Sequence, residues 1–370
     1  MGETKLLFRN GFIYFGEVQV HLFPLNSYLC LLHSFMEHED LDFLKSVFLE
    51  SSQVDVCVLL KDLVSSKSLP SVRKFSLFLE DLSSFGVGKF SLKRVSEHQV
   101  HISVENLVLS KLYKNIYGSV PPLSLEYLPA GFCKHAAELL FQKEVLEVSL
   151  EKNLICLELG EEKNFVLEKS PYVLEEQHFH ISPVLLKILS QKQIKISSGL
   201  FSIWNTYGIL VPYASLFSFL SRFDTSYYET FFEKLGVMQG RAAATLQSAV
   251  FGVHSDELFE RVIEQSQLVG MGRVLYYWET PFRFLIETNC SSSFSPLRLG
   301  SSLFYLYLCG IIKGVYEFCT EQRTLLSLRS REAFLEKCPV REDDDEEREI
   351  DVRINAKALL AKSCSLASKS

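Results

Sequence analysis

Hydrophobic and polar positions in the second half of the chain predict two helices followed by two strands. Apolar residues recur at helical spacing over residues 227–251 and again over 256–268. After a glycine-containing turn at 270–272, β-branched and aromatic residues predict strands at 274–278 and 282–288. This order of elements is typical of an α+β unit, in which helices and antiparallel strands are grouped rather than alternating.

A fainter version of the same pattern lies in the first half of the chain. Its landmarks recur further on: Gly11 as Gly199, Pro24 as Pro212, Phe35 as Phe223 and Gly131 as Gly310. The spacing is 188 residues for Pro24 and Pro212 and 179 residues for Gly131 and Gly310. A drift of this kind is what loop insertions produce in a duplicated domain, so we predict an internal repeat.

The repeat predicts two tandem copies of one helix-plus-antiparallel-sheet module. We expect a first domain at 1–170, a linker at 171–196, a second domain at 197–354 and a C-terminal tail at 355–370. The linker contains prolines and mixed polar residues, which suit a connection between domains.

Composition narrows the class of protein. The chain has 370 residues, 47% of them hydrophobic and 22% charged, which are globular values. The net charge of −7 argues against a nucleic-acid-binding protein, which would show a basic face. The nine cysteines form no CxxC pair, and most lie in apolar runs, as reduced core cysteines do.

The sequence also predicts a cytoplasmic protein with no membrane span. The start of the chain lacks the profile of a signal peptide. The most apolar run, residues 299–312, has 14 residues, whereas a spanning helix needs about 20.

Several short motifs resemble the 4-vinyl-reductase (4VR, or V-4-R) domain family. They are the run 228–241, with two glycines four residues apart, the Gly-x-Gly turn at 270–272, the helices that contain Gly131 and Gly310, and the hairpin at 156–165. This family is similar in fold to TRAPP trafficking-complex subunits and to haem nitric-oxide-binding domains. The resemblance covers nearly the whole chain twice. It implies a small, mostly apolar ligand pocket, frequent dimerisation, and roles in sensing or tetrapyrrole metabolism.

The resemblance also implies a zinc site near the closing hairpin, built from cysteines and an acid. Here Cys156 is present, but Asn164 stands eight residues later and Glu126 stands where a cysteine is often found. In the second copy Tyr305 takes that place, and only Cys338 remains. Zinc requires three or four converging ligands, so we expect that both copies have lost this site and predict no cofactor.

A ridge of small residues is the candidate interface. Gly236, Gly240, Ala244 and Ser248 recur every four residues on one helix face, which lets another helix approach closely. The ridge predicts either a dimer or domain contact, or close packing within one domain. The first copy has larger residues at most of the corresponding positions.

Aromatic residues concentrate in the second copy and are the candidate ligand-binding residues. They are Tyr276, Trp278, Phe282, Tyr305 and Tyr307. Aromatic walls suit an apolar or planar ligand, although residues of this type also form ordinary hydrophobic cores.

No catalytic residue can be nominated. The Gly-x-Gly turns follow helices and precede strands, so they fit turn geometry rather than phosphate binding, which needs a strand, a turn and a helix. We interpret His178 and His180 as solvated linker residues and His135 as a surface or capping residue. The acidic run at 342–349 lacks the oxygen spacing of a calcium loop.

The leading hypothesis is a small-molecule-binding or sensor protein that signals through a partner and whose copies pack as a pseudo-dimer, or whose chains form a homodimer. A TRAPP-like interaction scaffold without a ligand is the second hypothesis, and a tetrapyrrole-pathway accessory protein is the third. The first two differ in one respect: a sensor needs an apolar cavity, whereas a scaffold fills that space with side chains.

Overall fold

The protein has an α+β fold that forms two compact units in the computed structural model. Unit 1 holds nearly all described residues up to Arg222, and unit 2 holds those from Phe223 onward. The structure describes residues 6–9, 12–167, 194–197, 200–203, 206–251, 256–266, 270, 274–280, 283–288, 298–321, 324–329 and 332–337.

Two sheets and a set of helices build unit 1. Its strands are β1 (Leu6–Arg9), β2 (Phe12–Phe15), β3 (Val18–Pro24), β4 (Lys89–Val95), β5 (Gln99–Glu105), β6 (Lys143–Glu151), β7 (Leu154–Glu162), β8 (Ile194–Ser197), β9 (Leu200–Ile203) and β10 (Thr206–Pro212). Its helices are α1 (Leu25–His38), α2 (Leu41–Glu50), α3 (Gln53–Ser65), α4 (Ser71–Ser83), α5 (Val108–Tyr117), α6 (Tyr127–Phe141) and α8 (Tyr213–Leu220).

Local sequence signals set several helix ends. Proline stands at the N-cap of α1 and α8, where its missing N–H costs nothing because the first helical N–H groups have no partner in the helix. The Asp40 carboxylate caps α2 by accepting a hydrogen bond from the Phe43 N–H at 2.9 Å. Gly118 ends α5 in the left-handed conformation, with φ of 74°.

The larger sheet has the strand order β1-β2-β3-β10-β9-β8. At its centre β3 pairs with β10 in antiparallel register, with Leu22 opposite Leu210. Each of β8, β9 and β10 begins 188 residues after β1, β2 and β3 respectively. The second three strands of the sheet therefore repeat the first three in reverse order. At the centre of the sheet, Leu22 pairs with its own counterpart in the repeat (22 + 188 = 210).

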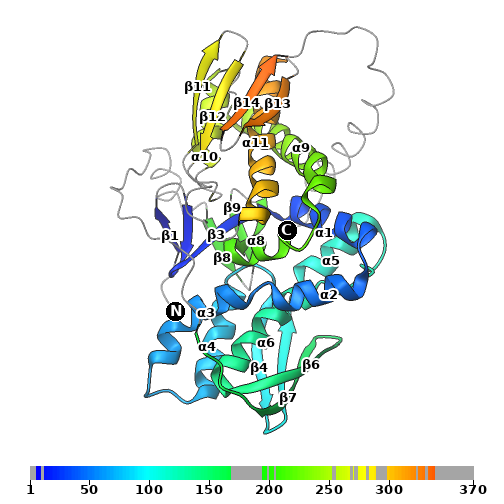
Figure 1. The fold of residues 1–370 in the computed structure, drawn as a ribbon, viewed down its shortest axis with the longest axis vertical. Coiled ribbons are helices and arrows are strands. Elements are labelled where there is room, and N and C mark those ends of the chain that lie inside the picture. Colours follow the sequence, from blue (N-terminus) through cyan, green and yellow to red (C-terminus); the bar gives the residue numbers. More distant parts are fainter. Residues whose placement is uncertain are drawn as a thin grey trace. The chain divides into compact units, whose positions relative to one another are not determined.

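The smaller sheet of unit 1 has the order β4-β5-β7-β6. Figure 1 shows α6 lying against this sheet, with α3 and α4 nearby. Most of α6 is buried because it packs between the other helices and the sheet. The core of this unit is apolar, and Phe35, Phe48, Phe75 and Phe78 are fully buried in it.

Unit 2 repeats the smaller sheet with different helices. Its elements are α9 (Thr225–Phe251), α10 (Asp256–Ser266), β11 (Val274–Thr280), β12 (Arg283–Thr288), α11 (Arg298–Thr320), β13 (Thr324–Arg329) and β14 (Glu332–Lys337). Its sheet order, β11-β12-β14-β13, matches β4-β5-β7-β6 element for element. Figure 1 shows α9 and α11 running side by side.

Helix α11 is longer than the apolar run suggested. The segment Leu303–Thr320 is long and apolar enough to cross a membrane by length and composition, and 72% of it is buried inside the protein. A buried core helix satisfies the same criterion.

The compact units and the expected domains divide the chain at different places. The expected second domain begins at residue 197, but β8, β9, β10 and α8 belong to unit 1, which extends to Arg222. Most of the expected linker and the whole C-terminal tail lie outside the described residues, as do Phe282, Cys338, His178 and His180.

Candidate functional site

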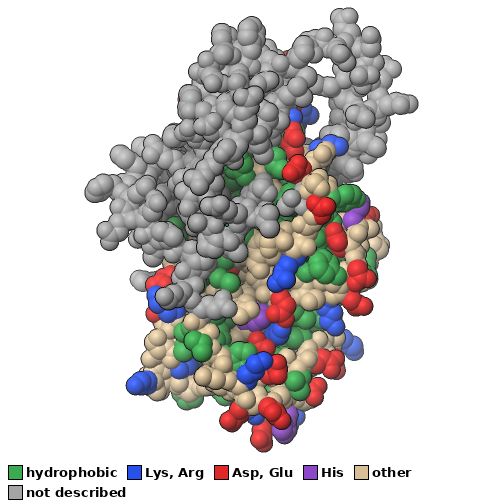
Figure 2. All heavy atoms as spheres, viewed as in Figure 1, with side chains coloured by type: hydrophobic (Ala, Val, Ile, Leu, Met, Phe, Trp, Pro, Cys, Tyr) green, Lys and Arg blue, Asp and Glu red, His purple; other side chains and the backbone are tan. Residues whose placement is uncertain are grey.

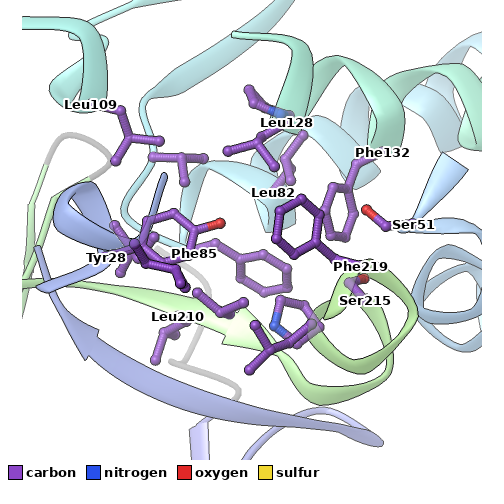
Figure 3. Close-up of a pocket in the computed structure, with 17 residues that line it drawn as sticks. Tyr28, Ser51, Leu82, Phe85, Leu109, Leu128, Phe132, Leu210, Ser215 and Phe219 are labelled. Carbon is purple, nitrogen blue, oxygen red and sulfur yellow. The ribbon is translucent and has the colours of Figure 1, made fainter. Parts of the chain in front are cut away.

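The first hollow in unit 1 is an apolar core pocket. It lies where β10 and α8 pack against α1, α4 and α6, and Figure 3 shows Tyr28, Leu82, Phe85, Phe132, Leu210 and Phe219 among its walls. The Leu210 N–H donates to the Phe85 carbonyl at 2.8 Å and fixes β10 against the end of α4. Burial raises the pKa of the Tyr28 hydroxyl above its ordinary value, so it stays protonated at neutral pH.

The core pocket is almost filled. Its volume is about 60 Å³, room for roughly two water molecules at ~30 Å³ each. Small-molecule pockets usually measure about 300 to 1,000 Å³. Edge-to-face ring contacts take up the space: the centroids of Phe15 and Phe85 are 5.1 Å apart, and those of Phe35 and Phe219 are also 5.1 Å apart.

A buried polar contact closes one wall of the core pocket. Asp55 of α3 is fully buried, and its carboxylate accepts hydrogen bonds from the Ser215 N–H at 2.5 Å and from the Ser215 hydroxyl. Since Pro212 cannot cap α8, Asp55 supplies both the missing acceptor and a negative charge at the start of that helix. Figure 3 shows Ser215 beside Phe219 at this wall.

The second hollow, which we call the α5 pocket, is larger and opens to the surface. Its volume is about 520 Å³. The walls come from α5, the loop at 118–126, β5 and the β6–β7 hairpin. Apolar side chains of this pocket include Val104, Leu107, Pro121, Leu154 and Ile155.

The polar groups of the α5 pocket come from three elements. Ser110, Lys111 and Lys114 lie on α5, Glu126 directly precedes α6, and Lys152 lies in the turn between β6 and β7. The Glu126 carboxylate accepts hydrogen bonds from the hydroxyls of Ser110, at 2.7 Å, and Ser124. The arrangement can therefore present both cationic donors and one oriented carboxylate to a bound molecule.

The candidate ligand-binding residues of the second copy fall into two groups. Tyr305 and Tyr307 lie on α11, and Tyr307 is 1% exposed, with the pKa of its hydroxyl raised by burial. Tyr276 and Trp278 lie on β11, on one face of the strand by alternation, but their side chains are outside the described set.

The candidate interface lies at a helix crossing inside unit 2. A Cβ on Gly240 would come within 2.0 Å of the Ile311 carbonyl oxygen, and one on Gly236 within 2.2 Å of the Tyr307 carbonyl oxygen. Both glycines thus pack against α11, as the intradomain alternative describes. Further along α9, Ala244 is fully buried and Ser248 is half-buried.

The expected zinc positions do not converge among the residues that the structure describes. No group of three or more His, Cys, Asp or Glu residues in that set could hold a metal ion. Cys156 lies on β7, while Glu126 is bound by two serine hydroxyls at the start of α6.

The interpretation of His135 as a surface or capping residue is wrong. His135 is 4% exposed, because α6 is enclosed by other helices and the small sheet. Its Nδ1 lies 3.1 Å from a Glu138 carboxylate oxygen, and the neighbouring Lys134 pairs with Glu50.

Sequence reasoning missed the α5 pocket. Two signals could have indicated α5: Leu109 and Tyr113 are apolar residues four apart, and Gly118 is a helix-ending glycine. No protein-family model, curated protein or solved structure matches this chain. The resemblance to 4-vinyl-reductase domains therefore stays a prediction.

Proposed function

We propose that this protein binds a small molecule and that the α5 pocket of unit 1 is the binding site. The observation that carries the proposal is a pocket of about 520 Å³ whose walls carry apolar side chains and several polar groups. That volume falls within the usual range for small-molecule sites, about 300 to 1,000 Å³. The core pocket, at about 60 Å³, is far too small for the same role.

We also propose that the chain consists of two 4-vinyl-reductase-like domains packed as a pseudo-dimer. The 188-residue offset of three consecutive strands and the equal order of the two small sheets support this reading. The pairing of β3 with β10 has the self-complementary register of a two-fold interface. On this proposal the protein is cytoplasmic and signals its ligand state through a protein partner.

Native mass spectrometry of protein purified from a cell lysate tests the binding function. We expect an extra mass of a few hundred daltons that disappears under denaturing conditions. Val120, which is 71% exposed at the α5 pocket, is the position to block: Val120→Trp should remove the extra mass. Val166→Trp is the matched control, because Val166 is 74% exposed and does not line this pocket.

An interaction scaffold is the second candidate function, and the nearly filled core pocket favours it. A scaffold of this kind would co-purify from the lysate with another polypeptide and without a bound small molecule. If the wild-type chain and both tryptophan variants all show the same bare mass or the same protein partner, ligand binding at the α5 pocket is wrong.

A further inference from the structure

We propose that the α5 pocket selects molecules that carry an acidic group, a carboxylate or a phosphate, on an apolar body. Lys111, Lys114 and Lys152 would bind the acidic group. This inference rests on the proposed binding function and goes beyond it by naming the chemistry of the ligand.

The charge around the pocket points to an anion. Its walls carry three lysines and one glutamate, a formal balance of 3 − 1 = +2, in a chain whose net charge is −7. On the face shown in Figure 2, acidic and basic side chains are intermixed over unit 1. A concentration of one sign in a hollow with apolar walls focuses the electrostatic potential on a ligand there.

Among the residues that the structure describes, the three lysines have no acidic partner, unlike several other lysines of the unit. Lys61, Lys89, Lys134 and Lys163 each pair with a glutamate. Within the part of the chain that the structure describes, Lys111, Lys114 and Lys152 form no ion pair. Glu126 offsets one of the three positive charges, and its carboxylate is held by the Ser110 and Ser124 hydroxyls rather than by a lysine.

The lysines reach the pocket from two separate elements. Lys111 and Lys114 are three residues apart on α5, so they lie on neighbouring parts of one helix face. Lys152 comes from the β6–β7 turn, which is anchored to β5 by a hydrogen bond from the Val104 N–H to the Asn153 carbonyl at 2.8 Å. An anion between the helix and the turn could contact ammonium groups from both.

The backbone at Lys152 is a further reason to assign it a role. Its φ is 47°, in the left-handed region that glycine and asparagine tolerate better than lysine. Residues in such a conformation occur in tight hairpin turns and are also concentrated at functional sites. Lys152→Asn should therefore leave the hairpin at least as stable while it weakens anion binding.

Two fluorescent probes with the same aromatic rings test the proposal on the full chain. Anilinonaphthalene sulfonate carries an anion, and N-phenylnaphthylamine is its neutral counterpart. We expect the wild-type protein to bind the sulfonate probe about tenfold more tightly than the neutral probe, with each of the three lysines contributing roughly twofold. The triple variant without these lysines (Lys111→Ala, Lys114→Ala, Lys152→Asn) should bind the sulfonate probe no more tightly than it binds the neutral probe. Lys67→Ala with Lys93→Ala, two exposed lysines elsewhere, is the control.

Competitors identify the acidic group. Decanoate and decyl phosphate should displace the sulfonate probe, whereas decanol, which has no acidic group, should not. The better of the two competitors shows whether the pocket prefers a carboxylate or a phosphate. Higher ionic strength should weaken binding of the sulfonate probe and leave binding of the neutral probe unchanged.

The outcomes separate the two proposals. If both probes bind equally, if the lysine variants change nothing, and if Val120→Trp still abolishes binding, the selection of anions is wrong and the binding function stands. If Val120→Trp alters neither probe, both proposals are wrong. Circular dichroism of each variant shows whether the fold is intact.

Discussion

Helix α9 of unit 2 and the helices α2 and α3 of unit 1 lie at corresponding positions of the sequence repeat, but only α9 is continuous. Residues 41–65 of the first copy correspond to 229–253 of the second at an offset of 188. In the first copy the helix breaks at Ser51 and Ser52, and the position of Ser52 is taken by Gly240 in α9.

The partner helices show what this difference achieves. In unit 1 a single glycine, Gly131 of α6, lies against the backbone of α2, where a Cβ would come within 2.5 Å of the Phe48 carbonyl oxygen. In unit 2 glycines on both helices meet, two from α9 and two from α11: Gly236, Gly240, Gly310 and Gly314. The crossing of α9 and α11 therefore has glycines on both helices, whereas the contact of α6 with α2 has one.

The largest expected effect is at Gly240. Gly240→Ala would place a Cβ 2.0 Å from the Ile311 carbonyl oxygen, so α9 and α11 must separate. We expect a loss of more than about 3 kcal/mol in the free energy of unfolding of unit 2, measured by denaturant unfolding. Ser248→Ala, on the same face of α9, should change it by less than about 0.5 kcal/mol. A loss at Gly240 as small as that would show that the helices do not cross as closely as described.

Gly131 and Gly310 allow a direct comparison of the copies. A Cβ on either would come within 2.5 Å of a carbonyl oxygen, that of Phe48 for Gly131 and that of Glu233 for Gly310. We expect each change to alanine to cost its own unit about 2.5 kcal/mol.

Thiol alkylation followed by peptide mapping reads out the two units separately. Cys133 of unit 1 and Cys309 of unit 2 are fully buried, and burial raises the pKa of the Cys133 thiol. Since the thiolate is the reactive form, Cys133 should be labelled only when unit 1 opens. Gly131→Ala should accelerate labelling of Cys133, and Gly310→Ala should accelerate labelling of Cys309. If only one of the two substitutions strongly destabilises its unit, the two glycines do not have equivalent roles.

The carboxylate that caps α8 comes from the first copy and has no counterpart in the second. Asp55 binds the start of α8, whereas the residue 188 positions later is Ala243. Asp55→Ala leaves the buried Ser215 N–H without its acceptor, and we expect a cost of roughly 2 kcal/mol in unit 1. Asp62→Ala, at an exposed position of the same helix, is the control in the same unfolding experiment. Equal stabilities of the two variants would rule out the capping role.

The smallest effect is expected at the helix break itself. Ser52 is 1% exposed, and its hydroxyl has no hydrogen-bond partner among the described residues. Removing an unsatisfied buried hydroxyl is close to neutral, so Ser52→Ala should raise the stability of unit 1 by about 0 to 1 kcal/mol. A clear loss in calorimetry would mean that this hydroxyl supports the break between α2 and α3.

Local signals in the sequence predicted many elements well. The α+β class is confirmed, Pro24 and Pro212 directly precede α1 and α8, and the 188-residue offset holds for three strands. At the position of the single helix α9, the first copy has the pair α2 and α3, because a serine pair interrupts an otherwise helical apolar pattern. Short amphipathic α5 was missed, since only Leu109 and Tyr113 are buried in it.

Long-range pairing was beyond the reach of these signals. Repeat offsets show which segments correspond, but they do not show that β10 and α8 pack with the first copy. The α5 pocket shares this difficulty, because it joins α5 to a hairpin turn about 40 residues away, an arrangement that only tertiary packing reveals.

The pairing of β3 with β10 also has a consequence for synthesis of the chain on the ribosome. Leu22 leaves the ribosome long before its partner Leu210 is made. At about 5 to 20 residues per second, the interval is roughly 10 to 40 s. During that time the inner edge of β3 and the apolar surfaces later covered by β10 and α8 have no partner, so the nascent chain is expected to depend on chaperones until residue 222 has emerged.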